Sequence, residues 1–137
     1  MLVYRTSSEE ETIALGRQFA KALSSPVTVL LIGDLGAGKT TLAKGIVDGL
    51  GAATEDEVSS PTFTLIHEYR NVYHIDLYRL DTAAEVMTLG LEELLERDAV
   101  VLIEWGERFP RIWPDDRIEI RIHAQGDERE FHVTGLK

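Results

Sequence analysis

Residues 33–40 combine glycines, a lysine and a threonine in a spacing that suits the binding of phosphate groups. They read GDLGAGKT and fit the pattern G-x-x-x-x-G-K-[ST]. Glycines let successive backbone N–H groups turn towards phosphate oxygens, because no Cβ atom stands in the way. Lys39 could reach the β- and γ-phosphates of a nucleotide, and the Thr40 hydroxyl could ligate Mg²⁺. The residues predicted to contact the nucleotide in this stretch are Gly33, Asp34, Leu35, Gly36, Ala37, Gly38, Lys39, Thr40 and Thr41.

A carboxylate is expected beside the phosphates, where it would hold the metal ion or its water ligands. The apolar run Val100–Ile103 ends in Glu104, which resembles a Walker B strand with glutamate in place of the usual aspartate. Asp76 is the best candidate for a second carboxylate, because an acid in so apolar a strand needs Arg79, a metal ion or water as partner. Taken alone, Asp76 would more commonly be half of a structural ion pair. The predicted metal ligands are Thr40, Glu104 and Asp76.

A hydroxyl-rich loop, Ser59–Thr62, precedes a segment that reads TFTLIHEYRNVYHIDLYRL, residues 62–80. The segment predicts two strands of an antiparallel hairpin, with the turn near Arg70 and Asn71. Alternation along the second strand places His74, Asp76 and Tyr78 on one face. A loop with Thr62 at this place could sense a γ-phosphate, as switch loops do. The predicted catalytic residues are Lys39, Thr62, Asp76 and Glu104.

The elements on either side of the glycine loop are those that a phosphate site requires. Val27–Ile32 is apolar except for Thr28, as in a strand covered on both faces of a parallel sheet. After the loop, Leu42, Ile46 and Leu50 recur at helical spacing, and glycines 49 and 51 offer a stop. A buried strand, a glycine loop and a helix therefore follow one another, and a glycine-rich turn with a surface lysine explains the pattern less well.

Three further elements complete the predicted fold. The spacing of Ser7 and Ser8 before Glu10 and Glu11 predicts a capped helix that ends at residues 24–26. A second amphipathic helix is predicted from Thr82 to Glu96 despite a glycine at position 90, and residues 117–135 predict another hairpin. The expected fold class is α/β: a P-loop NTPase built as a three-layer sandwich, with a mixed central sheet that includes antiparallel hairpins. One domain is expected over residues 1–137.

Composition excludes several classes of function. The chain has no cysteine, which removes disulfides, thiol catalysis and cysteine-ligated metals. Fourteen basic and twenty-four acidic side chains give a net charge of −10, a poor match for a protein that holds a polyanion by itself. The start of the chain lacks the pattern of a secretory signal, and no apolar run approaches the ~20 residues of a membrane span. A cytoplasmic protein without a membrane role is therefore expected.

Four motifs in this order, GDLGAGKTTL, SPTFTL, HIDLYRL and LIEW, resemble the TsaE family (older name YjeE) of small bacterial ATPases. The match spans Leu30 to Trp105, and the second and third motifs are specific to that family. The resemblance implies a part in making threonylcarbamoyladenosine, the tRNA modification beside the anticodon. It implies binding and hydrolysis of ATP with Mg²⁺, and partners TsaB and TsaD, the second of which carries out the transfer to tRNA.

The resemblance also implies roles for individual residues. Lys39, Thr40 and Thr41 fall on the family's phosphate loop, Thr62 on its switch-like loop and Asp76 on its conserved aspartate. Glu104 falls on the glutamate associated with Mg²⁺, and Trp105 on a tryptophan near the nucleotide. The segment after Trp105 carries little family signal, and Arg129 there is a candidate nucleotide contact that the resemblance does not supply. Activity alone is expected to be weak and completed by a partner, with tRNA met only through the complex.

Three alternatives stay open from the sequence. A small-molecule P-loop kinase shares the loop but generally needs an arginine-bearing lid. A GTPase-like switch would need an N-K-x-D motif for guanine, which this chain lacks, and a D-x-x-G motif after the second strand, where the chain reads EWGE. A nucleotide-dependent scaffold would show no difference in partner affinity between ATP and ADP. The four histidines are interpreted as structural, although His74 shares a predicted strand face with Asp76.

Overall fold

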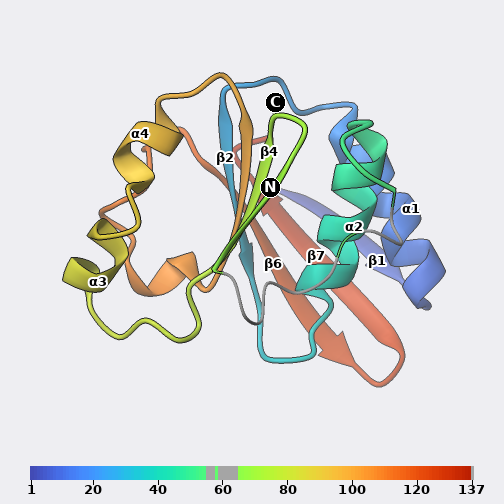
Figure 1. The fold of residues 1–137 in the computed structure, drawn as a ribbon. Helices are drawn as coiled ribbons and strands as arrows, with labels where there is room; N and C mark the ends of the chain where they lie inside the picture. Colours follow the sequence, from blue (N-terminus) through green and yellow to red (C-terminus); the bar gives the residue numbers. More distant parts are fainter. Residues whose placement is uncertain (55–57, 59–64, 137) are drawn as a thin grey trace.

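A computed structural model describes residues 1–54, 58 and 65–136 of the chain. Its described part contains a seven-stranded sheet in the order β1-β7-β6-β2-β5-β4-β3 (Figure 1). The strands are β1 (Leu2–Thr6), β2 (Val27–Ile32), β3 (Ile66–Tyr69), β4 (Val72–Asp76), β5 (Val100–Glu104), β6 (Ile118–Gln125) and β7 (Glu128–Thr134). The helices are α1 (Glu9–Ala20), α2 (Lys39–Gly49), α3 (Ala83–Met87), α4 (Leu91–Leu95) and the 3-10 helix η2 (Gly106–Arg108).

The sheet is mixed, as predicted. Strand β2 pairs in parallel with both β5 and β6, and β4 pairs in parallel with β5. The pairs β3–β4, β6–β7 and β1–β7 are antiparallel. Register places Leu31 opposite Glu104, and Glu104 opposite Asp76, so the carboxyl ends of β2, β5 and β4 meet at one edge. In open α/β sheets this edge is where ligands bind.

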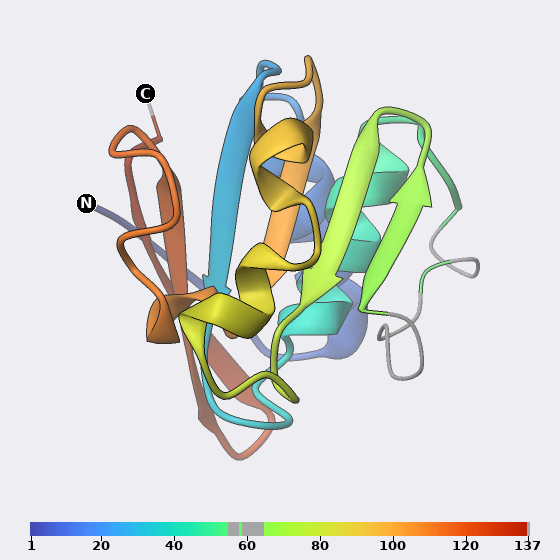
Figure 2. The same ribbon diagram turned by 60° about the vertical axis from the view of Figure 1, so that its left-hand side comes forward.

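Helices cover both faces of the sheet and make three layers (Figures 1 and 2). On one face, Phe19 of α1 and Leu42 and Ile46 of α2 belong to a buried cluster with side chains of β2 and its neighbours. On the other face, Val86 of α3 and Leu91 of α4 belong to a second cluster with β2, β4 and β5. The central strands are therefore apolar on both sides, which is why β2 reads as a continuous hydrophobic run.

Helices α1 and α2 pack closely because glycines face each other. A Cβ atom at Gly45 would lie 2.1 Å from the carbonyl oxygen of Ile13, and one at Gly16 would lie 2.5 Å from that of Leu42. The start of α1 is capped as the sequence predicts: Ser8 accepts a hydrogen bond from the backbone N–H of Glu11. The close contact fixes the first turn of α1 relative to the helix that follows the glycine loop.

Three sequence predictions are corrected. Thr82 to Glu96 is not one helix: α3 and α4 are separate five-residue helices, and Gly90 between them takes a left-handed φ of 72°. Helix α1 ends at Ala20, so Leu23 packs on the core from the following turn. Strand β4 ends at Asp76, and Tyr78 lies beyond it, half exposed, instead of continuing the strand face.

The turn of the first hairpin is where the sequence places it, at Arg70 and Asn71, and Asn71 adopts a positive φ of 56°. The C-terminal hairpin is also confirmed as β6 and β7. The edge strand β1 is an addition to the predicted elements. The longest helix in the described ranges has 12 residues, too few to cross a bilayer, which takes about 20.

Candidate functional site

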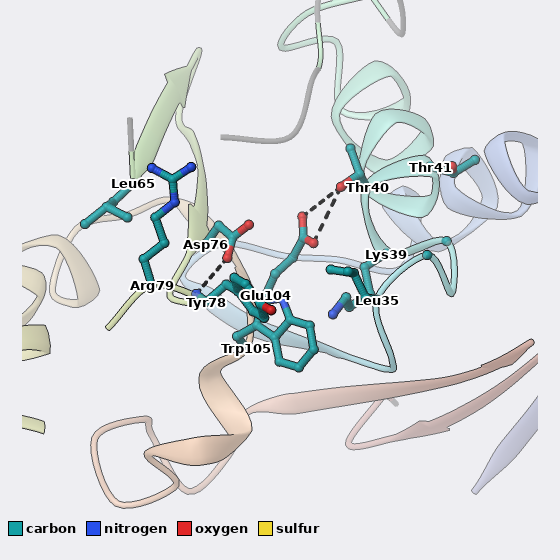
Figure 3. Close-up of a pocket in the computed structure, with 12 residues that line it drawn as sticks. Leu35, Lys39, Thr40, Thr41, Leu65, Asp76, Tyr78, Arg79, Glu104 and Trp105 are labelled. Atoms are coloured by element: carbon teal, nitrogen blue, oxygen red, sulfur yellow. Dashed lines mark hydrogen bonds between the residues drawn. The ribbon is translucent and has the colours of Figure 1, made fainter. Parts of the chain in front are cut away.

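A cavity of about 480 Å³ opens at the carboxyl edge of the parallel strands (Figure 3). One wall is the glycine loop and the first turn of α2, and the second is the end of β4 with the segment after it. The third wall is the end of β5. The predicted side chains Lys39, Thr40, Asp76, Glu104 and Trp105 come from all three walls and line this one cavity.

The glycine loop has a backbone conformation that would be strained with other residues at positions 36 and 38. Gly36 and Gly38 have positive φ angles of 79° and 109°, and Gly38 is the residue before the first turn of α2. At its tip, Leu35 is 75% exposed, while Ala37 is buried. Gly36 and Gly38 line the cavity with the first turn of α2, so the positive end of the α2 dipole lies beside it, an arrangement that favours anions.

Lys39 is almost fully buried and held at two points. Its Nζ donates a hydrogen bond of 2.7 Å to the carbonyl oxygen of Gly33, and it lies 3.4 Å from the centroid of the Trp105 ring. Burial lowers the pKa of the Lys39 ammonium, and the nearby Glu104 carboxylate opposes that change. Phosphate oxygens would compete with the Gly33 carbonyl oxygen and the Trp105 ring for the Lys39 ammonium.

Trp105 reaches the cavity because the chain turns sharply at the end of β5. Its φ is 66°, a left-handed conformation that is uncommon for a non-glycine residue. The next residue, Gly106, leaves no room for a side chain, since a Cβ atom would lie 2.8 Å from Ile103. Tyr78 covers the Trp105 ring with a centroid distance of 5.0 Å. The sharp turn thus places the Trp105 ring against the Lys39 ammonium.

Glu104 is 3% exposed and bridges two partners. Its Oε2 lies 3.2 Å from the Thr40 hydroxyl, which donates to it, and 2.5 Å from Nε2 of His74. Figure 3 shows the Thr40 contact across the cavity. The carboxylate therefore faces the start of α2, as the metal side of a phosphate site requires.

Asp76 lies beside Glu104 at the end of the neighbouring strand and is partly buried. Its Oδ1 accepts a hydrogen bond of 2.8 Å from the backbone N–H of Tyr78. Burial raises the pKa of Asp76, the Tyr78 bond lowers it, and the Glu104 charge raises it again. Within the described ranges Asp76 makes no ion pair with Arg79, so its partner is a backbone amide. A cation between these two neighbouring carboxylates would reduce the repulsion between their charges.

The oxygen atoms that Thr40, Asp76 and Glu104 bring to the cavity fit Mg²⁺. A hydroxyl and two carboxylates are the hard oxygen ligands that this ion prefers. No group of three His, Cys, Asp or Glu side chains in the described part of the chain could hold a metal ion alone. A cation here would therefore depend on Thr40 and on oxygens of a ligand, as with Mg²⁺ bound together with nucleotide phosphates.

A second cavity of about 470 Å³ lies on the other side of the glycine loop. The start of α1 lines it with Ser7, Ser8 and Thr12, while Asp127 of the β6–β7 turn and Arg129 at the start of β7 complete the lining. Arg129 donates to the carbonyl oxygens of Gly126 and Glu128, which holds its side chain beside the loop. The α1 residues were not predicted as site residues, since their only sequence signal is that of a helix cap.

The other predicted contacts are distributed differently. Gly36, Gly38 and Thr41 line both cavities, and Leu35 lines the first. Gly33 and Asp34 face a smaller cavity of about 220 Å³ instead. Thr62 and the rest of the expected sensor loop lie outside the described residues. Arg79, weighed only as a partner for Asp76, is an additional residue of the main cavity wall.

Comparisons of the sequence with known proteins identify its family. A family model described as threonylcarbamoyl adenosine biosynthesis protein TsaE matches residues 6–131. A relative from Bacillus subtilis (strain 168), named tRNA threonylcarbamoyladenosine biosynthesis protein TsaE, is 42% identical over 98% of this chain and 86% of its own. A relative with the same name from Nostoc sp. is 44% identical over 93% of this chain and 82% of its own.

A solved structure shows the same fold. The crystal structure of Bacillus subtilis YdiB superposes with a TM-score of 0.77 at 37% identity, and covers 99% of this chain and 86% of that one. The family match takes in the glycine loop, both carboxylates and the start of α1. The chain is therefore a member of the TsaE family, which takes part in the biosynthesis of threonylcarbamoyladenosine in tRNA.

Proposed function

We propose that this chain is a P-loop NTPase that binds and hydrolyses ATP with Mg²⁺ in the threonylcarbamoyladenosine pathway. The observation that carries the proposal is the convergence of Lys39, Thr40, Glu104 and Asp76 on one cavity at the end of the glycine loop. Phosphoryl transfer needs little covalent chemistry from a protein, so positioning and charge neutralisation are most of the task.

Each side chain has a role that its position supports. Lys39 neutralises the β- and γ-phosphates after it leaves the Gly33 carbonyl, and backbone N–H groups of the loop bind the same oxygens. Thr40 provides a hydroxyl ligand, and Glu104 and Asp76 hold water molecules or orient the attacking one. Bound Mg²⁺ would supply charge neutralisation at the phosphate oxygens. The contacting rings of Tyr78 and Trp105 would form an apolar part of the cavity lining.

The second cavity is the place for the rest of the nucleotide. It adjoins the loop through Gly36, Gly38 and Thr41, and its hydroxyl groups from Ser7 and Ser8 suit a ribose or a base edge. Arg129 stands on the same side. A nucleoside there and phosphates at Lys39 would span both sides of the glycine loop.

The proposed partners are TsaB and TsaD, with turnover weak until they bind. Leu35 and Tyr78 are exposed at the rim of the cavity, where a partner could cover the site and add a positive group. tRNA would be reached through these partners, since the net charge of −10 disfavours direct binding. A role on tRNA would place the chain in the cytoplasm.

Calorimetry of nucleotide binding tests the proposal. The wild-type chain is expected to bind ADP and ATP, with ATP binding strengthened by Mg²⁺, and Lys39→Ala is expected to lose at least about tenfold in affinity, or 1.4 kcal/mol. Lys21→Ala, which removes an exposed lysine after α1, should bind as wild type does. Equal binding by Lys39→Ala and wild type would overturn the site assignment.

The same samples separate the alternatives. GDP bound tenfold tighter than ADP would indicate a GTPase-like switch. Rapid phosphate transfer to a nucleoside or sugar-like acceptor would indicate a kinase. Equal affinity for TsaB and TsaD in ATP and ADP would indicate a scaffold, because a switch needs different affinities in its two states.

A further inference from the structure

We propose that His74 is the positioning residue of this site: it donates a hydrogen bond from Nε2 to Glu104 and fixes the direction in which that carboxylate faces the cavity. The inference rests on the proposed function, because it assigns a role within the same site. His74 has no contact of its own with the cavity and would act only through Glu104.

The pair is buried and close. His74 is 0% exposed, Glu104 is 3% exposed, and Nε2 lies 2.5 Å from Oε2. In the β4–β5 register, Asp76 stands opposite Glu104 and His74 stands opposite Leu102. His74 precedes Asp76 by two residues on β4, so it lies farther from the carboxyl edge of the sheet. The two side chains are on the same face, since side chains alternate along a strand. It lies where the apolar core meets the polar cavity.

The second ring nitrogen indicates why a histidine stands there. Nδ1 is buried and, among the described residues, has no hydrogen-bond partner. An apolar side chain would fill this space without leaving a polar atom unpaired, which costs about 1–3 kcal/mol. The one hydrogen bond that His74 makes with a carboxylate is thus the feature that an apolar residue could not replace. When the ring proton is on Nε2, His74 donates to Glu104, and Nδ1 is an acceptor without a hydrogen-bond partner among the described residues.

Glu104 needs this partner most when the site is in use. Its other partner within the described residues is the Thr40 hydroxyl, at 3.2 Å from Oε2 and 3.5 Å from Oε1. A cation that recruits the Thr40 oxygen would weaken this contact, and His74 would then be the remaining fixed donor. Without it, the repulsion between Glu104 and the adjacent Asp76 would turn the carboxylate out of place.

Three variants test the role. His74→Leu fills the site with an apolar side chain and removes the hydrogen-bond donor. His74→Gln keeps an N–H donor that can reach Glu104. His67→Leu is the matched control: it lies opposite His74 on β3 and contacts Tyr69 instead of Glu104. Each is measured for ADP affinity without Mg²⁺, thermal stability, kcat for ATP hydrolysis with TsaB and TsaD, and the Mg²⁺ concentration at half-maximal rate.

His74→Leu should lower kcat or raise the Mg²⁺ requirement by about 10- to 100-fold, the usual effect of losing a partner of a ligating carboxylate. Its ADP affinity without Mg²⁺ should stay within about twofold, because Lys39 and the loop are intact. His74→Gln should recover most of the loss, and His67→Leu should behave as wild type. Wild-type kinetics in His74→Leu would overturn the proposal, as would equal losses of stability and ADP affinity in His74→Leu and His74→Gln.

The tautomer gives a readout that does not depend on ATP hydrolysis. Long-range ¹H–¹⁵N correlation spectra of the free protein should show the His74 proton on Nε2, with a resonance that shifts in Glu104→Gln. A ring proton on Nδ1 alone, with Nε2 unprotonated, would overturn the proposal even if the chain hydrolyses ATP. Conversely, an Nε2 proton in a chain whose Lys39→Ala variant binds nucleotide normally would leave the pair intact and refute the proposed site.

Discussion

Lys39 makes two contacts that a bound nucleotide would compete with. The Gly33 carbonyl and the Trp105 ring hold its ammonium at 2.7 Å and 3.4 Å. A contact of this kind with an aromatic face is worth about 0.5–2 kcal/mol, and a neutral hydrogen-bond acceptor competes poorly with charged phosphate oxygens. Binding of phosphates should therefore draw Lys39 away from the Trp105 ring, which makes that ring a reporter of the site.

This exchange predicts a fluorescence change. Titration with ADP should alter tryptophan emission, and Trp105→Phe should abolish the response while calorimetry still detects ADP binding. The second tryptophan, Trp113, is 3% exposed and donates from Nε1 to the Gly106 carbonyl, so it should contribute little. A response of full amplitude in Trp105→Phe would show that the signal arises elsewhere and that Lys39 does not move in this way.

At the scale of elements, the contact between α1 and α2 couples the two cavities. The first turn of α1 lines the second cavity, and α2 starts at Lys39 in the first. Gly45 faces Ile13 so closely that any side chain there must push the helices apart. The geometry of the whole site thus depends on a glycine that lines neither cavity.

Gly45→Ala should destabilise the fold. The added methyl group would meet the Ile13 carbonyl oxygen at 2.1 Å, and overpacking of this kind typically costs about 1–3 kcal/mol. Urea denaturation monitored by circular dichroism should show the lowered free energy of unfolding. The neighbouring variant Lys44→Ala should stay within about 0.5 kcal/mol of wild type. Wild-type stability in Gly45→Ala would mean that α1 and α2 are not packed through these glycines.

The sequence predicts those elements whose signals are local. The strand, glycine loop and helix around Lys39 follow from apolar spacing and from residues 33–40. The break at Gly90 was missed because the apolar positions on its two sides keep a helical period, while a left-handed glycine separates the helices. Strand β1 was missed because it pairs with β7, more than a hundred residues away.

The same distinction holds for the candidate site. Lys39, Thr40, Asp76, Glu104 and Trp105 were nominated from motifs and do line one cavity. The pairing of His74 with Glu104 was not predicted, because it depends on the register between β4 and β5. The second cavity was also invisible, since it joins the start of α1 to the distant β6–β7 turn. Contacts that arise only when the sheet assembles leave no local pattern.

The net charge of the molecule predicts weak direct binding to tRNA. A net charge of −10 opposes the binding of a polyanion, whose affinity comes largely from cationic contacts with phosphates. In a gel-shift assay the isolated chain should leave tRNA unshifted at physiological salt, and a shift should require the partner proteins. Tight, salt-sensitive binding of tRNA by the chain alone would contradict an indirect role.

The most direct test of ATP hydrolysis at this site is phosphate release by the proposed complex with TsaB and TsaD, compared between wild type and Glu104→Ala. Because Glu104 lies on the metal side and Lys39 remains in place, the variant should still bind ADP but release phosphate at least about tenfold more slowly. Glu92→Ala, which removes an exposed glutamate of α4, should match wild type. Phosphate release at the wild-type rate by Glu104→Ala would contradict a catalytic site between the glycine loop and β5.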